Sequence, residues 1–115
     1  MTRSIRRSVV FAGIAFTSMA LAGGTATGQI DHFMTGNNNG QEFLLVYFAS
    51  VTGAPTCSVA PRFIMLSTDV NYKSTLAIVM ASYYSGSIVT VVGTGACSTW
   101  TNTEEVSYIC APGGC

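Results

Sequence analysis

The chain has 115 residues, only 9% of which are charged, and its formal net charge at neutral pH is zero. Three of its five basic residues fall within the first seven positions, so the remainder carries Arg62 and Lys73 against five acidic side chains, which is two minus five, or −3. Two isolated cations form no basic stripe along which a phosphate backbone could bind, so neither nucleic acid nor an anionic membrane surface is an expected partner.

Residues 1–28 have the three-part layout of a secretory signal peptide. Basic residues within positions 3–7 precede an uncharged, apolar stretch over 9–22. That stretch holds about 14 residues, short of the roughly 20 that a membrane-spanning helix requires, so a cleaved signal is favoured over a membrane anchor. The arginine pair at positions 6 and 7 lacks the other features of a twin-arginine signal.

Small residues offer two cleavage sites. The preferred one follows Ala26-Thr27-Gly28 and leaves Gln29 as the first residue, and the alternative follows Ala20-Leu21-Ala22 and leaves Gly23. The product is expected to be a secreted or periplasmic domain without a membrane span. A domain of roughly 85 residues buries only a modest core, and such domains often need a covalent staple.

An even number of cysteines in an exported chain indicates disulfide bonds. All four lie beyond the signal, at Cys57, Cys97, Cys110 and Cys115. Of the three pairings, Cys57–Cys97 with Cys110–Cys115 is favoured. Closing these two loops would raise the free energy of unfolding by roughly 4 and about 2 kcal/mol, respectively. Zinc is disfavoured because no two cysteines have the close spacing of a zinc ribbon. Neither a metal nor a cofactor is expected.

The first elements are predicted in this order. Residues 29–41 form a polar segment, with Asn37-Asn38-Asn39-Gly40 near its end, that is expected to be a flexible loop. A well-buried strand is predicted over Glu42–Ser50. A second β-like run, Cys57–Leu66, is interrupted by Pro61, which cannot donate to a strand ladder, so it is either an edge strand or two short pieces. One further strand is allowed before residue 42 or within this run.

A helix is predicted next, beginning at the cap-like cluster Ser67-Thr68-Asp69 and running to about Tyr84. Gly86 is placed to end it in a left-handed cap. From the three- and four-residue spacing of apolar side chains, its buried face is expected to comprise Tyr72, Leu76, Val79, Met80 and Tyr83.

Two strands close the sequence, Ile88–Val92 and Glu105–Cys110, separated by a Gly-Thr-Gly turn. In the last strand Val106, Tyr108 and Cys110 are expected to share one face. Short strands around one amphipathic helix favour an α+β, mainly β fold. The predicted architecture is a small OB-like, partly open antiparallel barrel, stapled by disulfides and covering residues 42–115.

Few residues suit catalysis. The only histidine, His32, falls in the segment that is expected to be mobile and is a poor general base. Glu104 and Glu105 are neighbours on a predicted strand, where they point to opposite faces and cannot flank one glycosidic bond. The glycine-rich stretch 93–98 precedes a strand and not a helix, so it is interpreted as a plain turn rather than a phosphate loop. The chain is therefore not expected to be an enzyme.

A binding role is better supported, and it centres on the only tryptophan. Residues 97–103 surround it with hydroxyl and amide groups, and an aromatic face beside fixed polar groups is what sugar recognition requires. The competing interpretation is that the indole folds back into the core. The candidate ligand-binding residues are Ser98, Thr99, Trp100 and Asn102, with Tyr83 and Tyr84 at the end of the predicted helix.

The stretch 72–109 carries a family resemblance. Its helix ends in Ala81-Ser82-Tyr83-Tyr84-Ser85-Gly86, and the strand Ile88–Val92 follows. Gly95-Ala96-Cys97-Ser98-Thr99-Trp100 then precedes Glu104-Glu105-Val106-Ser107-Tyr108-Ile109. This pattern resembles small secreted bacterial proteins that are similar to the B subunits of AB-type toxins, including the subtilase-cytotoxin and pertussis-like groups.

The resemblance implies an OB fold, assembly into a pentameric ring, binding of host glycans and a disulfide that corresponds to Cys57–Cys97. It covers less than half of the mature chain. The chain departs from the pattern in its additional Cys110 and Cys115, and no serine of its N-terminal half aligns with a glycan-binding serine of the family. A companion subunit is not identified by the resemblance.

Three hypotheses follow. The leading one is an exported, non-enzymatic, oligomeric module that binds carbohydrate or another cell-surface ligand. The alternative is a secreted or periplasmic structural or inhibitory protein that acts through protein contacts. The third is a small exported hydrolase, which would need a free thiol or a polar cleft.

Overall fold

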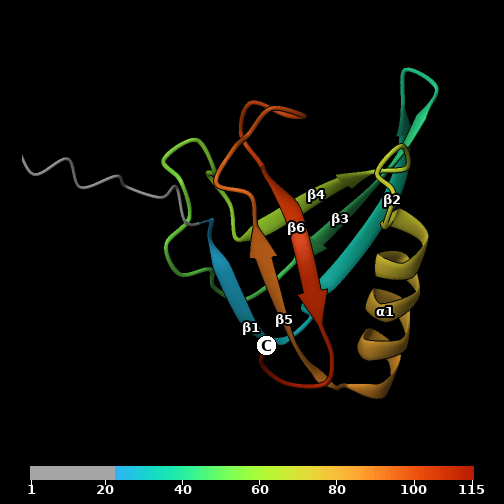
Figure 1. Ribbon diagram of the computed structural model, residues 1–115, viewed down its shortest axis with the longest axis vertical. Helices are drawn as coiled ribbons and strands as arrows, with labels where there is room; N and C mark the ends of the chain where they lie inside the picture. The colour runs from blue at the N-terminus through green and yellow to red at the C-terminus, as the bar shows by residue number, and fades with distance from the viewer. Residues whose placement is uncertain (1–22) are drawn as a thin grey trace, which may run out of the picture.

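The computed structural model describes residues 23–115, which form one six-stranded sheet and one helix (Figure 1). The elements in chain order are β1 (Thr25–Gln29), β2 (His32–Asn38), β3 (Gln41–Tyr47), β4 (Arg62–Leu66), α1 (Tyr72–Ser85), β5 (Ile88–Gly93) and β6 (Glu104–Cys110). The strands lie in the order β1-β5-β6-β4-β3-β2. Every neighbouring pair is antiparallel except β4 and β6, which run parallel.

The two edges of this sheet are consecutive in the chain. β1 and β2 stand at opposite ends of the strand order, yet only Ile30 and Asp31 separate them. Counted as one bent strand, β1 and β2 join the edges into a five-stranded, partly open barrel of the OB type. α1 connects β4 to β5 and lies beside β2 (Figure 1). The ring centroids of Tyr83 on α1 and Phe33 on β2 are 5.4 Å apart. The predicted α+β, mainly β, partly open barrel is confirmed, apart from its one parallel strand pair.

The segment 29–41 is ordered within the sheet, so the prediction that it is flexible is wrong. β2 pairs with β3 along its whole length. The turn between them places Asn39 and Gly40 at φ angles of 53° and 81°. Positive φ at both central residues is the geometry of the hairpin turn that Asn-Gly sequences prefer. The polarity of this segment suggests a loop, but its Asn-Gly turn chemistry indicates a hairpin. His32 lies on β2, so the prediction that it falls in a mobile region is also wrong.

The ordered domain begins well before residue 42, where its start was predicted. β1 pairs with β5 from Thr25 opposite Val92 to Gln29 opposite Ile88. Ala26 of β1 is only 1% exposed and belongs to the core. Cleavage before Gln29 would remove this strand, so the preferred cleavage site does not fit the sheet. The remainder of the predicted signal, residues 1–22, lies outside the residues that the structure describes.

β3 is buried on both of its faces, which explains its unbroken apolar sequence. Leu44 and Val46 belong to the cluster inside the barrel, while Phe43 and Leu45 alternate with them on the outside. The buried residues of the interior cluster are Ala26, Ile30, Leu44, Val46, Phe48, Phe63, Met65, Tyr72, Val79, Val89, Val91 and Val106. The outer cluster adds Ile64 of β4 and is partly covered by Trp100.

α1 begins later than the predicted cap cluster. Asn71 occupies the cap position and makes no side-chain capping bond. The carboxylate of Asp69 instead accepts a hydrogen bond from the Leu66 amide at 3.1 Å, which closes a turn before the helix. Gly86 ends the helix at φ 68°, in the left-handed cap that was predicted. Within residues 23–115 no helix has the length and apolarity that crossing a membrane demands.

The buried face of α1 is rotated from the predicted one. Met80 and Tyr83 are 44% and 39% exposed, so the prediction is wrong for both, and Leu76 is half-buried. Small hydroxyl side chains lie against the barrel in their place, which lets the helix approach closely. The buried residues of the helix are Tyr72, Thr75, Val79 and Ser82.

A bulge in β6 changes which of its side chains face the core. Val106 and Tyr108 pair with consecutive residues of β5, so Ser107 between them has no partner in the ladder. Val106 is buried, whereas Tyr108 is 47% exposed. The common face predicted for Val106 and Tyr108 is therefore wrong, and beyond the bulge Ile109 packs against the core instead.

Both predicted disulfides are present. Cys57–Cys97 joins the loop between β3 and β4 to the loop between β5 and β6, with the Cα atoms 6.2 Å apart. Cys110–Cys115 folds the C-terminal tail back onto the end of β6 at a Cα separation of 5.5 Å. No cysteine in residues 23–115 is free.

The two bridges are expected to contribute unequally to stability. Replacing Cys57 and Cys97 by serine should lower the free energy of unfolding by about 4 kcal/mol, against about 2 kcal/mol for the tail bridge, because the longer loop restricts the unfolded chain more. Urea unfolding of the two double-serine variants measures both losses. The expectation would be contradicted if loss of the tail bridge lowered the free energy of unfolding as much as, or more than, loss of Cys57–Cys97.

Candidate functional site

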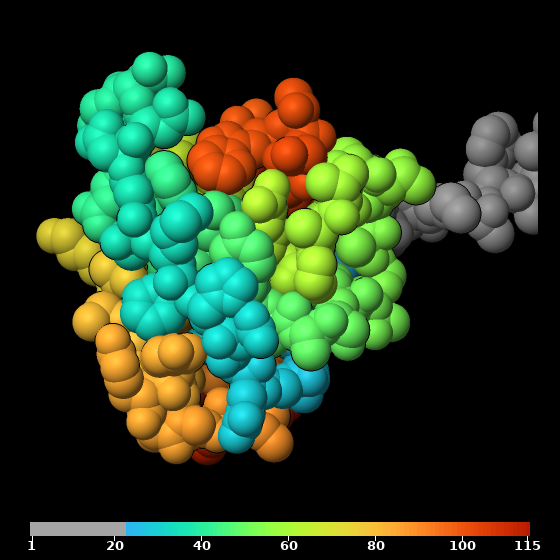
Figure 2. Space-filling view, turned by 180° about the vertical axis from the view of Figure 1, so that it is seen from behind, coloured from blue at the N-terminus to red at the C-terminus, as the bar shows by residue number. Residues whose placement is uncertain are grey.

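Trp100 lies at the turn of the loop that connects β5 to β6. The loop folds back on itself so that Trp100 and Thr103 form an isolated bridge. The indole is half-buried and packs edge-on against Phe43 of β3, with ring centroids 5.0 Å apart. Figure 2 shows this orange-red loop between the teal tip of the β2–β3 hairpin and the yellow-green segment that precedes β4. The indole is thus anchored at one edge and accessible at the other.

The support beneath Trp100 depends on a glycine. Gly36 of β2 lies directly opposite Phe43 in the strand pairing. A Cβ atom at Gly36 would stand 2.6 Å from Cζ of the Phe43 ring, so any side chain at this position would force the ring to shift. The phenylalanine ring therefore lies over the bare backbone of Gly36, and Trp100 packs against this ring.

Glu105 orders the part of the loop that precedes Trp100. Its carboxylate accepts hydrogen bonds from Ser98 Oγ and from Thr99 Oγ1, the latter at 2.7 Å. Burial by itself would raise the pKa of Glu105, but the hydrogen bonds from these two residues outweigh it and lower the pKa below its ordinary value. Because both hydroxyl hydrogens point to the carboxylate, the oxygen lone pairs remain free to accept from a ligand. The disulfide at Cys97 fixes the same segment from its other side.

A depression of about 390 Å³ opens beside the indole. It brings together Ser98, Thr99 and Trp100, as predicted, with side chains from the β2–β3 hairpin that were not predicted. The lining residues are Asn38, Asn39, Gln41, Leu66, Ser98, Thr99, Trp100 and Glu105. The three hairpin residues carry amides and are exposed. Hydroxyls, amides and one carboxylate therefore surround a single aromatic ring.

Three other predicted residues lie outside this depression. Asn102 uses its side-chain oxygen to accept a hydrogen bond from Arg62 Nη2 at 3.3 Å. Tyr83 and Tyr84 are on the last turn of α1, where Tyr83 packs against Phe33 of β2. Asn102, Tyr83 and Tyr84 are thus predicted ligand-binding residues that do not line the Trp100 depression.

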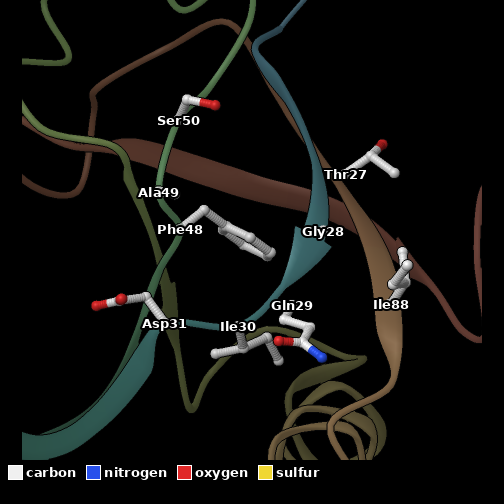
Figure 3. Close-up of a pocket in the computed structure, with 9 residues that line it drawn as sticks. All are labelled: Thr27, Gly28, Gln29, Ile30, Asp31, Phe48, Ala49, Ser50 and Ile88. Atoms are coloured by element: carbon white, nitrogen blue, oxygen red, sulfur yellow. The ribbon is translucent and has the colours of Figure 1, made fainter.

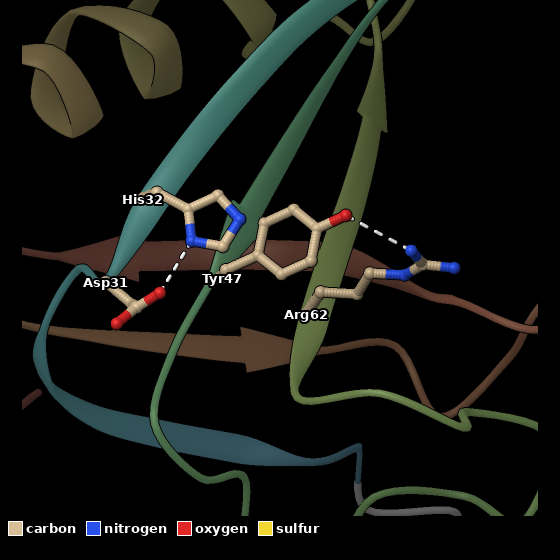
Figure 4. Close-up of polar contacts among 4 residues, drawn as sticks. All are labelled: Asp31, His32, Tyr47 and Arg62. Carbon is tan, nitrogen blue, oxygen red and sulfur yellow. Dashed lines mark hydrogen bonds and ion pairs between the residues drawn. The ribbon is translucent and has the colours of Figure 1, made fainter.

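A row of cross-strand neighbours adjoins the depression on the outer face of the sheet (Figure 4). His32, Tyr47 and Arg62 are register partners on β2, β3 and β4. The imidazole stacks on the Tyr47 ring at 4.0 Å and its Nδ1 lies 2.6 Å from Oδ2 of Asp31. Arg62 Nη1 donates to the Tyr47 hydroxyl at 3.1 Å, and its guanidinium lies 5.9 Å from the centre of the Trp100 ring. The row therefore continues the aromatic and polar surface away from Trp100.

A second depression, of about 500 Å³, lies where β1 bends into β2 (Figure 3). Its aromatic side chain, Phe48, points toward Gly28 and is only 4% exposed, so it offers no ring face to a ligand. Asp31 is its one carboxylate, and Gly28, Ile30, Ala49 and Ile88 line it without a polar side-chain group. The Trp100 depression is the better candidate because its aromatic ring is accessible.

The two adjacent carboxylates do not form a catalytic pair. Glu105 faces the outer depression, while Glu104 is fully buried and accepts hydrogen bonds from the amides of Gly24 and Gly95. Within residues 23–115, no group of three or more histidine, cysteine, aspartate or glutamate side chains gathers as a metal site would require. The arrangement around Trp100 suits recognition by stacking and hydrogen bonding.

Comparison with known proteins assigns no family. No protein-family model matches the sequence, and no curated protein is significantly similar to it.

The hydrogen bonds to Glu105 predict a pH dependence. Its pKa is lower in the folded chain than the ordinary value of 4.5, so its stabilising effect is complete above that value and is lost as the pH falls through the folded pKa. Trp100 fluorescence should report loosening of the loop in that acidic range, and Glu105→Gln should abolish the step. Glu42→Gln, the same change at an exposed carboxylate on β3, is the matched control. A step that persists in the Glu105 variant would contradict the assignment.

Proposed function

We propose that the chain is an exported, non-enzymatic domain that binds carbohydrate in the depression beside Trp100. The observation that carries the proposal is the half-buried indole, fixed against Phe43 and bordered by the Ser98 and Thr99 hydroxyls and the hairpin amides. A sugar ring presents apolar C–H patches on its face and hydroxyls around its edge. The indole complements the former, and the polar rim complements the latter.

The direction of the hydrogen bonds supports a sugar rather than an apolar ligand. Ser98 and Thr99 donate to Glu105 and can accept from sugar hydroxyls. Asn38, Asn39 and Gln41 supply both amide donors and carbonyl acceptors. Since the loop is already held by Glu105 and by the disulfide at Cys97, little ordering is needed on binding, which favours affinity. A longer glycan can extend onto the adjoining row of His32, Tyr47 and Arg62.

The proposed export and assembly rest on the sequence. The N-terminal pattern of a signal peptide and the two disulfides support a secreted or periplasmic location. The resemblance to toxin B subunits, together with the OB-like barrel, supports a homo-oligomer, with a pentameric ring as the specific expectation.

Screening on an array of immobilised oligosaccharides tests the binding proposal. Trp100→Ala is expected to weaken retention at least tenfold, or about 1.4 kcal/mol, because the stacking surface is lost. Trp100 also covers the outer cluster, so Gln41→Ala, at an exposed rim position, is the second variant and should weaken binding without unfolding the domain. Tyr84→Ala removes a more exposed aromatic ring, on α1, and serves as the control.

The proposal fails if no oligosaccharide is retained by the folded wild-type domain. It also fails if binding is found but the Trp100 and Gln41 variants bind as well as the wild type.

A second candidate function, contact with protein, is supported by the outer surface of α1. Met80, Tyr83 and Tyr84 are 44%, 39% and 77% exposed on neighbouring turns. Exposed aromatic and methionine side chains of this kind are enriched at protein interfaces. Light scattering should give a mass above that of a monomer, and Tyr84→Asp should reduce it. A monomeric wild-type chain, or an oligomer indifferent to Tyr84→Asp, would contradict a role of this surface in self-assembly.

A further inference from the structure

Glu104 is an acidic side chain buried without a cation. It is 0% exposed at the start of β6. In residues 23–115 the single ion pair joins Asp31 to His32, and Arg62 directs its hydrogen bonds to Tyr47, Asn102 and Thr103. A carboxylate removed from water needs compensation by hydrogen bonds and opposite charge. The amides of Gly24 and Gly95 supply hydrogen bonds but no positive charge.

The carboxylate is enclosed by glycine backbone. A Cβ at Gly93 would lie 2.2 Å from Cδ of Glu104, and one at Gly24 would lie 2.7 Å from its Oε1. The Gly24 amide donates to both carboxylate oxygens, at 3.1 and 2.9 Å, and the Gly95 amide donates to Oε2 at 2.8 Å. These contacts bring the chain immediately after residue 22 against the acidic group.

Gly23 completes this enclosure. A Cβ there would lie 2.8 Å from Oε2 of Glu104 and 1.8 Å from the carbonyl oxygen of Gly93, so only glycine fits. An amide nitrogen and the Cβ of the same residue are about 2.5 Å apart, so the Gly23 nitrogen lies within roughly 5 Å of Oε2. In the precursor this nitrogen belongs to a neutral peptide bond.

We propose that cleavage between Ala22 and Gly23 creates the missing cation: the new α-ammonium group of Gly23 forms an ion pair with the buried Glu104. Hydrolysis of this peptide bond by a signal peptidase, which accepts small residues such as Ala20 and Ala22 before the cut, adds one water. Ala22 leaves as a carboxylate, and Gly23 gains an amine that takes up a proton. An α-amino group has a pKa of about 7.7–8.0 and is charged at neutral pH, and a nearby carboxylate favours the charged form.

Processing would therefore complete the fold as well as release the domain. Water screens the attraction between two charges less when one of them is buried, as Glu104 is. It would fix the start of β1, and with it the closure of the barrel, at the point where β5 and β6 also meet. The inference rests on the proposed export, but not on carbohydrate binding.

The first test is the N-terminus of the exported protein, made from the full precursor in a secreting bacterium. Intact mass and N-terminal sequencing should place Gly23 first. A product that begins at Gln29 would overturn the ion pair while leaving export intact, and an uncleaved chain would overturn both.

The second test moves the charge. Inserting Ala-Thr between Ala22 and Gly23 keeps the cleavage site and leaves the ammonium two residues away. The insertion should raise the unfolded fraction at a fixed urea concentration by tenfold or more, and in a Glu104→Gln background it should have no effect. An equal effect in both backgrounds, or none in either, would overturn the proposal.

The third test needs no change at Glu104 and therefore holds if Glu104→Gln does not fold. Trace acetylation of the folded protein at neutral pH compares the Gly23 α-amine with Lys73, which is exposed on α1 and serves as the internal standard. The paired amine should react at least tenfold more slowly, relative to Lys73, than the α-amine of the insertion variant. Equal relative rates would contradict an ion pair.

Discussion

The buried carboxylate of Glu104 is the contact on which the rest of this domain depends. It joins the N-terminal Gly24, the β5–β6 loop at Gly95 and the first residue of β6, three segments far apart in sequence. The next residue, Glu105, points outward and holds the loop before Trp100. Since neighbouring residues of a strand face opposite sides, anchoring Glu104 inside also sets the position of Glu105 outside. One pair of residues thus links the closure of the barrel to the order of the candidate binding loop.

The bend between β1 and β2 explains why the binding surface is where it is. Because β1 and β2 form the two edges of the sheet as one bent strand, the β2–β3 hairpin lies close to the loop between β5 and β6. The hairpin contributes the amides and the loop contributes the indole. Gly36 and Phe43 support the ring from below, and the disulfide between Cys57 and Cys97 restrains the loop. The side chains around Trp100 are therefore preorganised by strand pairing, ring packing and a disulfide, and the residues that make these contacts are spread over most of the domain.

Local patterns in the sequence predict much of this fold, and what they miss depends on long-range contacts. The apolar run of β3, the helix end at Gly86 and both disulfides follow from residue type and spacing. β1 is too short and polar to be recognised alone, because it becomes a strand only through pairing with β5. In the candidate site, Ser98, Thr99 and Trp100 are neighbours in sequence and can be predicted together, whereas Asn38, Asn39 and Gln41 reach them only through strand pairing. The Asn39-Gly40 turn was the one local signal that could have placed them.

Stacking of a carbohydrate on Trp100 can be followed by fluorescence, because this is the only tryptophan in the chain and its emission reports on the site alone. The most direct measurement is a titration of the disulfide-bonded domain with oligosaccharides released from cell-surface glycoproteins, followed by the emission of Trp100. We expect a saturable change in emission, since a sugar ring would replace water at the exposed edge of the indole. If the emission stays constant while the protein retains the same oligosaccharides, binding takes place elsewhere, and stacking of a sugar on Trp100 is contradicted.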